Sequence, residues 1–203
     1  MSTTTQNTTT PSVKTSLTRR LTFSALAIAL AFVTGNIKLF DMPMGGSVTL
    51  LGTFFICLVG YWYGIGAGAI AGIAYGLIQL LFDPYIISIP QLMIDYIFAF
   101  MALGALSGLG RNRKFGLSLG YLAGCLGRYF FAVLSGVVFF ASYAPETMNP
   151  VVYSLVYNIL YIAAEAAITL VIINIPVVRN ALDKVKEMAV GVESRESVAN
   201  ETV

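Results

Sequence analysis

Long apolar tracts alternate with short polar segments along most of the chain. An α-helix needs about 20 mostly apolar residues to cross a bilayer, and six tracts reach or approach that length. They predict membrane spans at Leu21–Leu39, Val48–Tyr63, Ile65–Phe82, Gln91–Leu109, Gly116–Ala141 and Val151–Ile175. Asn149 followed by Pro150 is a good helix start, with a polar cap before a proline at the first helical position. We therefore predict an all-α membrane protein with six transmembrane helices.

Polar ends flank this membrane domain. Residues 1–18 are rich in Ser and Thr and should form a disordered cytoplasmic tail. Residues 19–178 form the predicted six-helix membrane domain, and residues 179–203 a cytoplasmic C-terminal tail.

The distribution of basic residues predicts the orientation. If six spans alternate, ten basic residues fall on one side and only Lys38 on the other, with Arg128 inside a span. The ten are Lys14, Arg19, Arg20, Arg111, Arg113, Lys114, Arg179, Lys184, Lys186 and Arg195. Lysine and arginine are enriched in cytoplasmic loops. Both termini should therefore be cytoplasmic.

Composition supports a membrane location and narrows the function. The chain is 57% hydrophobic and only 11% charged, which is too few charges to coat a soluble globule of this size. Its basic residues are spread over loops rather than gathered in a patch, so nucleic acid is not an expected partner. There is no histidine, and Cys57 and Cys125 lie in apolar tracts as expected for small buried side chains. We predict neither a metal site nor a cofactor.

Small residues recur every four positions and predict close helix contacts. Two rows are glycine: Gly68, Gly72, Gly76 and Gly116, Gly120, Gly124. We expect both to serve packing within the molecule. The first span carries two alanine notches, Ala25 with Ala29 and Ala27 with Ala31, whose role is more ambiguous.

Three ionisable residues, Asp95, Arg128 and Glu165, lie inside apolar tracts. Each costs about 2.5–3.5 kcal/mol or more at the centre of a membrane helix, so such groups usually mark a functional site. Helical spacing places Gln91 on the same face as Asp95. It also gathers Tyr153, Tyr157, Asn158, Tyr161 and Glu165 within an arc of about 140° on the last span. These residues predict an enclosed polar and aromatic pocket between the last three spans, open to the cell exterior. The alternative is a set of internal ion pairs, Arg128 with Glu165 or Asp95, and an interfacial belt of tyrosines.

Several stretches together carry a family resemblance. They are Met42–Leu50, Tyr75–Leu80, Gln91–Tyr96, Ser135–Glu146, Met148–Pro150 and Tyr153–Asn158. Over about Leu21 to Ile175, the chain resembles the thiamine-specific substrate-binding subunits of energy-coupling factor transporters. The resemblance implies six helices, with a vitamin pocket near the outer face that is closed by the loop between the first two.

The resemblance also implies roles for particular residues. Asp95 would accept hydrogen bonds from the aminopyrimidine ring, and Phe140 would stack on that ring. Further pocket residues would be Arg128, Tyr153, Asn158, Tyr85 and Tyr96. Ala25 and Ala29 would dock onto the transmembrane coupling subunit.

The resemblance implies a vitamin-binding importer subunit in the cell membrane of a bacterium, with a transmembrane coupling subunit and two ATPase subunits as partners. The chain has no G-x-x-x-x-G-K-[ST] phosphate loop, so ATP hydrolysis is expected from those partners. Three alternatives remain open. Ala132 stands where the family usually has a histidine, so the cargo could be a thiamine precursor, a pyrimidine or a thiazole, or another small vitamin. The chain could also be an intramembrane enzyme using Asp95 and Glu165 as an acid–base pair, or a small channel.

Overall fold

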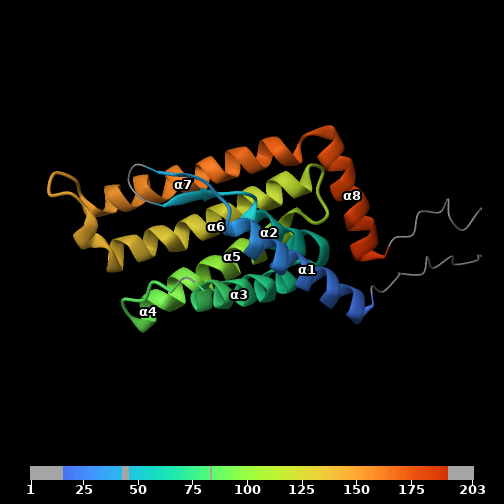
Figure 1. Cartoon of the computed structure of the whole chain (residues 1–203), viewed down its shortest axis with the longest axis horizontal. Coiled ribbons are helices and arrows are strands. Elements are labelled where there is room, and N and C mark those ends of the chain that lie inside the picture. The colour runs from blue at the N-terminus through green and yellow to red at the C-terminus, as the bar shows by residue number, and fades with distance from the viewer. Residues whose placement is uncertain (1–15, 43–45, 83, 192–203) are drawn as a thin grey trace, which may run out of the picture.

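The computed structural model describes residues 16–42, 46–82 and 84–191. In this part of the chain most helices run along one long axis, and α8 crosses one end of the bundle (Figure 1). The elements are α1 (Leu17–Gly35), β1 (Lys38–Asp41), β2 (Ser47–Thr49), α2 (Gly52–Tyr63), α3 (Ile65–Phe82), α4 (Ile89–Leu92), η1 (Met93–Phe98), α5 (Ala99–Ser107), η2 (Gly108–Gly110), α6 (Gly116–Phe139), η3 (Ala141–Tyr143), α7 (Pro150–Ile173) and α8 (Pro176–Val190). Residues 1–15 and 192–203 of the two predicted tails lie outside the described residues.

Five helical segments are long and apolar enough to cross a membrane. They are Leu17–Gly35, Ile65–Phe82, Ile89–Gly110, Gly116–Phe139 and Pro150–Ile173. These segments correspond to the first, third, fourth, fifth and sixth predicted spans. The all-α membrane fold is therefore confirmed, apart from two short strands.

The second predicted span, Val48–Tyr63, differs from the expectation. Its first residues belong to strand β2, and helix α2 has only 12 residues. That length rises about 18 Å, less than the roughly 30 Å of a bilayer's hydrocarbon core. Nearly every residue of α2 is buried by the helices around it, so α2 contacts protein rather than lipid. The six-span path therefore remains a prediction.

The ends of the first predicted span also differ. Helix α1 begins at Leu17, where the Ser16 hydroxyl caps it by accepting a hydrogen bond from the Arg19 N–H at 3.3 Å. It ends at Gly35, and Lys38–Asp41 then form β1, which pairs antiparallel with β2. The loop between the first two helices is thus an ordered hairpin over its described residues.

Both glycine rows pack within the molecule, as predicted. Gly68, Gly72 and Gly76 of α3 lie against the backbone carbonyls of Gly104, Phe100 and Tyr96. Gly116, Gly120 and Gly124 of α6 lie against those of Gly110, Ser107 and Leu103. A Cβ at any of these positions would collide with backbone, so the rows allow α3 and α6 to approach the fourth span from two sides.

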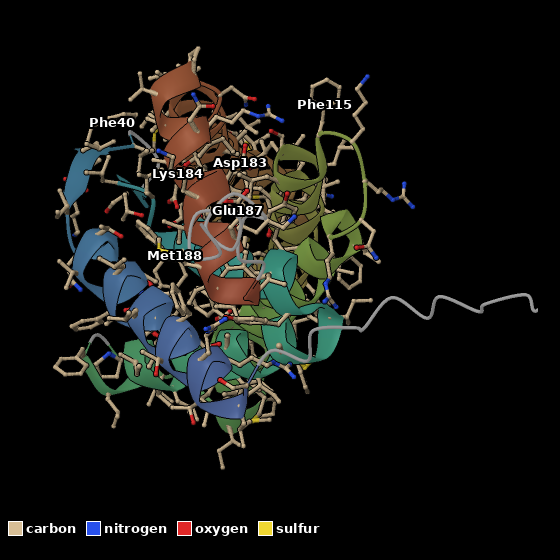
Figure 2. The ribbon with its side chains drawn as sticks, turned by 90° about the vertical axis from the view of Figure 1, so that its right-hand side faces the viewer. Phe40, Phe115, Asp183, Lys184, Glu187 and Met188 are labelled. Carbon is tan, nitrogen blue, oxygen red and sulfur yellow. The ribbon has the colours of Figure 1, made fainter. Side chains whose placement is uncertain are left out.

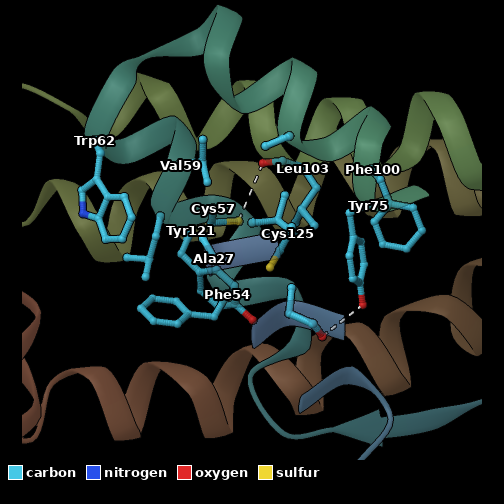
Figure 3. Packing of buried hydrophobic residues seen from close by; sticks show 14 of the residues in the cluster. Ala27, Phe54, Cys57, Val59, Trp62, Tyr75, Phe100, Leu103, Tyr121 and Cys125 are labelled. Carbon is cyan, nitrogen blue, oxygen red and sulfur yellow. Dashed lines mark hydrogen bonds between the residues drawn. The ribbon is translucent and has the colours of Figure 1, made fainter. Parts of the chain in front are cut away.

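The core between these helices is closely packed. Figure 3 shows Cys57 and Cys125 among buried aromatic and aliphatic side chains, including Phe54, Tyr75 and Tyr121. Both cysteines are free thiols, and the Cys57 Sγ–H donates to the Leu103 carbonyl at 3.7 Å. The prediction that they are buried packing residues is confirmed.

Basic residues from distant segments meet at the end of the bundle that α8 covers (Figure 2). The Lys186 ammonium of α8 lies 4.0 Å from the centre of the Tyr61 ring, and the Arg179 guanidinium lies 5.7 Å from the centre of the Phe115 ring. Near the start of α1, Arg20 lies 5.3 Å from the Tyr63 ring centre. The segments predicted to be cytoplasmic therefore share one end, as the positive-inside bias requires.

Candidate ligand-binding site

Asp95 lies in a widened turn of the fourth span. The sequence predicts a continuous helix there, but Met93–Phe98 (η1) is a π-helix between α4 and α5. Such widened turns are rare and are frequent at functional sites. The widening changes which side chains share a face, so helical spacing alone could not predict the direction of Asp95.

Gln91 holds Asp95 in place rather than lining the cavity. Its Nε2 donates to Asp95 Oδ2 at 2.7 Å and to the Tyr85 carbonyl at 3.1 Å. Its Oε1 accepts a hydrogen bond from the Ile87 N–H at 3.0 Å, and the side chain is only 1% exposed. The prediction that Gln91 shares a face with Asp95 is confirmed. The prediction that it binds ligand directly stays a prediction, and its amide already makes three hydrogen bonds inside the protein.

A cavity of about 500 Å³ lies between α3, the fourth span, α6 and α7. All the predicted ligand-binding residues except Gln91 line it. The complete lining is Gln79, Tyr85, Asp95, Tyr96, Ala99, Phe100, Arg128, Ala132, Ser135, Gly136, Phe140, Tyr143, Tyr153, Ser154, Tyr157, Asn158 and Tyr161. The sequence therefore predicted the walls on the last three spans but not the contribution of α3.

The two charged residues of the cavity are not paired with each other. The Asp95 carboxylate accepts from Gln91 at Oδ2, and Ser135 is its other polar neighbour. Arg128, near the middle of α6, has its guanidinium carbon 5.0 Å from the Phe100 ring centre and 5.9 Å from that of Tyr161. No described carboxylate lies within 4.0 Å of it, so the alternative of an ion pair with Asp95 or Glu165 is wrong.

Polar groups join α6 and α7 behind the cavity wall. Asn158 Nδ2 donates to the Ser154 carbonyl at 2.9 Å and to the Ala132 carbonyl at 3.4 Å, and its Oδ1 accepts from the Tyr161 hydroxyl at 2.9 Å. Asn158 therefore supports the wall as well as lining it. Ser135 lies beside Asp95, but its buried hydroxyl has no partner with hydrogen-bond geometry among the described residues. It is a polar group that a bound molecule could satisfy.

Aromatic residues from two loops line the end of the cavity farthest from α8. The rings of Tyr85 and Phe140 stack with centres 5.9 Å apart, and the hydroxyls of Tyr85 and Tyr143 lie 2.6 Å apart. The Tyr96 hydroxyl accepts a hydrogen bond from the Tyr85 N–H at 2.9 Å. The hydrogen bond to Tyr143 raises the pKa of Tyr85, so this phenol stays protonated at physiological pH.

Glu165 lies apart from this cavity, contrary to the expectation that all three ionisable residues line one pocket. Its Oε1 accepts from the Thr53 hydroxyl at 2.6 Å, and its Oε2 accepts from the Thr49 hydroxyl at 2.9 Å. It shares a helix face with Tyr161, as predicted, but it faces α2 and β2. Asp95 and Glu165 therefore do not share a cavity in which they could act as an acid–base pair.

Tyr157 and Tyr161 continue the four-residue spacing that begins at Tyr153, and they line the cavity as expected of that helix face. Other lining residues were not predicted. Gln79 and Phe100 carry no comparable pattern, because neighbouring helices alone bring them to the cavity.

The arrangement suits a flat, polar molecule. Aromatic faces bind planar rings and cations, and Asp95 provides an acceptor while Arg128 provides donors. One carboxylate and one guanidinium leave the cavity close to electrically neutral. Such a site can position and enclose a small heterocycle.

Comparison with known proteins identifies the family. The family model described as "Thiamine transporter protein" matches residues 21–184. The thiamine transporter ThiT of Bacillus subtilis (strain 168) is 34% identical over 164 residues, which cover 74% of this chain and 83% of that protein. A solved structure of ThiT from Listeria monocytogenes has the same fold, with a TM-score of 0.63 at 24% identity, and the match covers 85% of this chain and 96% of that one. The chain with this aromatic, singly acidic cavity therefore belongs to the thiamine transporter family.

Proposed function

We propose that this chain binds thiamine in the cavity and delivers it as the substrate-binding subunit of an energy-coupling factor importer. The observation that carries the proposal is the Asp95 carboxylate in a cavity walled by aromatic rings. The family membership supports the choice of thiamine.

The chemistry of thiamine fits such a site. Thiamine joins a flat aminopyrimidine to a cationic thiazolium ring. Asp95 accepts hydrogen bonds from the aminopyrimidine, and the rings of Phe140 and Tyr85 offer stacking surfaces. Arg128 presents N–H donors that suit a ring nitrogen or a hydroxyl of the ligand and not its cationic ring.

This chain is a transport protein and not an enzyme. It lacks the phosphate-binding loop of P-loop ATPases, so the energy for uptake comes from partner subunits. We propose that these are a transmembrane coupling subunit and two ATPase subunits. The cavity extends toward the end of the bundle farthest from α8. Release on the other side of the membrane therefore requires the subunit to reorient.

The surface of α1 supports a docking role for its alanine notch. Ala27 and Ala31 are buried against the bundle, whereas Ala25 and Ala29 are exposed on the other side of the helix. Small residues allow another helix to approach closely. The exposed pair is therefore the proposed contact with the coupling subunit.

Calorimetric titration of the purified protein with thiamine and with its separate pyrimidine and thiazole halves tests the ligand. Thiamine should bind most tightly, because only thiamine fills both the Asp95 side and the remainder of the cavity. Ala132 lines the cavity and supplies neither the flat surface nor the hydrogen-bonding group of a histidine, which keeps a precursor as the second candidate. Tighter binding of either half would establish that candidate, and no binding of any of the three would overturn the proposal.

Gln91→Leu should weaken thiamine binding about 5- to 30-fold, equivalent to about 1–2 kcal/mol, because Asp95 loses the hydrogen bond that orients it. Calorimetry measures the change. Asn174→Leu is the matched control, since Asn174 also makes several amide hydrogen bonds but lies near α8 at the far end. Equal affinities in the Gln91 variant and the parent would show that Asp95 needs no such support.

A further inference from the structure

Glu165 is a buried carboxylate that the proposed ligand contacts do not use. It is 4% exposed, and no described basic group lies within 4.0 Å of it. Its hydrogen-bond donors are the Thr49 hydroxyl at 2.9 Å, the Thr53 hydroxyl at 2.6 Å and the Thr53 N–H at 3.4 Å. A buried charge without such donors would be strongly destabilising. The donors belong to β2 and α2, so Glu165 joins α7 to both elements.

Glu165 acts as the missing N-terminal cap of α2. The residue before the helix, Leu51, has φ of 60° and makes no side-chain capping bond. The first N–H groups of a helix need acceptors from elsewhere, and negative charge is favourable at this end of the helix dipole. Glu165 supplies both the acceptor and the negative group. Its Oε1 accepts from the Thr53 N–H, although the two residues are 112 positions apart in the sequence. The tight connection from β2 into α2 thus depends on a residue of α7.

The same carboxylate fixes β2 against the cavity wall. Thr49 ends strand β2, whose middle residue Val48 is fully buried (0% exposed), and Gly46 directly precedes the strand. Gly46 adopts φ of +79°, and a Cβ there would lie 3.1 Å from Tyr161 Cδ1 and 3.5 Å from the Tyr157 hydroxyl. Both tyrosines line the cavity. Figure 1 shows the hairpin extending along α7, the helix that carries both tyrosines.

We infer that Glu165 is a positioning residue for ligand binding. By holding β2 and the first turn of α2 on α7, it keeps the wall formed by Tyr157 and Tyr161 in its binding arrangement. Glu165 does not touch the ligand. This inference rests on the proposed function, because its kinetic test uses thiamine. A loosened wall releases a bound ligand faster, and changes within one interface usually appear in the dissociation rate.

The test measures association and dissociation of labelled thiamine with the full chain in nanodiscs. Glu165→Ala should dissociate about tenfold faster, with association changed less than about twofold. Glu165→Gln keeps an oxygen acceptor for Thr53 and should restore dissociation to within about threefold of the parent. Thr49→Val removes only the strand's hydrogen bond and should also speed dissociation. Thr22→Val is the control, because Thr22 is exposed on α1 and bonds only to the Thr18 carbonyl of its own helix.

Hydrogen–deuterium exchange of the ligand-free protein provides a second measurement. In Glu165→Ala, amides of residues 49–54 should exchange faster, while those of α5 should not change. If Glu165→Ala fails to fold, Thr49→Val decides: parental dissociation together with parental exchange of residues 49–54 in that variant would overturn the inference. Unchanged dissociation and exchange in a folded Glu165→Ala would overturn it directly. If the parent protein does not bind thiamine, the proposed function fails, but the exchange measurement still tests the role of Glu165.

Discussion

Asp95→Asn should weaken thiamine binding by about 10- to 150-fold. Hydrogen bonds to a charged group contribute about 1.5–3 kcal/mol, which corresponds to that range. The asparagine has the same shape, so the cavity keeps its volume. It lacks the negative charge, however, and presents an amide that can accept through only one oxygen. The cavity would also retain Arg128 without an opposite charge, which disfavours a cationic ligand.

Calorimetry on the purified variant measures this effect. Asp183→Asn is the matched control, because Asp183 is an exposed carboxylate on α8 (Figure 2), and α8 lies at the end of the bundle opposite α4 (Figure 1). The control should bind like the parent. An Asp95→Asn protein with parental affinity would remove Asp95 from the binding site and, with it, the main support for the proposed ligand.

Ala25→Leu combined with Ala29→Leu should abolish most thiamine uptake in cells that express the complete importer, while the purified variant binds thiamine normally. Both alanines are exposed on α1 and do not line the cavity. Two leucines would keep a partner helix from the close approach that small residues allow. Binding depends on residues from other helices, so it should not change.

The control for this pair is Ala163→Leu with Ala167→Leu. These alanines are also exposed and four residues apart, but on α7. Uptake of radiolabelled thiamine should stay close to parental in the control and fall steeply in the α1 variant. Parental uptake in the α1 variant would show that its exposed notch faces only lipid. Equal losses in the two variants would show that any leucine pair at a membrane-facing notch is harmful.

Local patterns in the sequence predicted most of the helices. Apolar length located the five long segments to within a few residues, and Asn149 followed by Pro150 begins α7 as predicted, with Asn149 Oδ1 accepting from the Val151 N–H at 2.8 Å. Local patterns failed where pairing or packing between segments sets the backbone. Strand β2 replaces the start of the second predicted span because β1 pairs with it, and that pairing carries no strong signal in an apolar tract.

The site shows the same division. Asp95 and Arg128 could be identified from sequence because a charge in a membrane-spanning helix is costly and therefore conspicuous. The same reasoning selected Glu165, which turned out to cap α2 instead of lining the cavity. Gln91 lies one helical turn from Asp95, yet its amide is consumed by internal hydrogen bonds. Spacing shows which residues are neighbours on a helix, but not whether a neighbour faces the ligand or supports the residue that does.

The sequence by itself determined that this is a helical membrane protein, which residues in it carry unusual charge, and which glycine rows bring its helices together. These properties depend on hydrophobic transfer and on spacing along one helix, both of which are local. Only the tertiary structure decided that Asp95 and Arg128 share a cavity while Glu165 does not, and that Gln79 of α3 joins them. Those outcomes depend on how helices far apart in the chain rotate against one another and on the widened turn at Met93–Phe98. Rotating a helix about its axis by a fraction of a full revolution moves a side chain from the cavity into a packed interface.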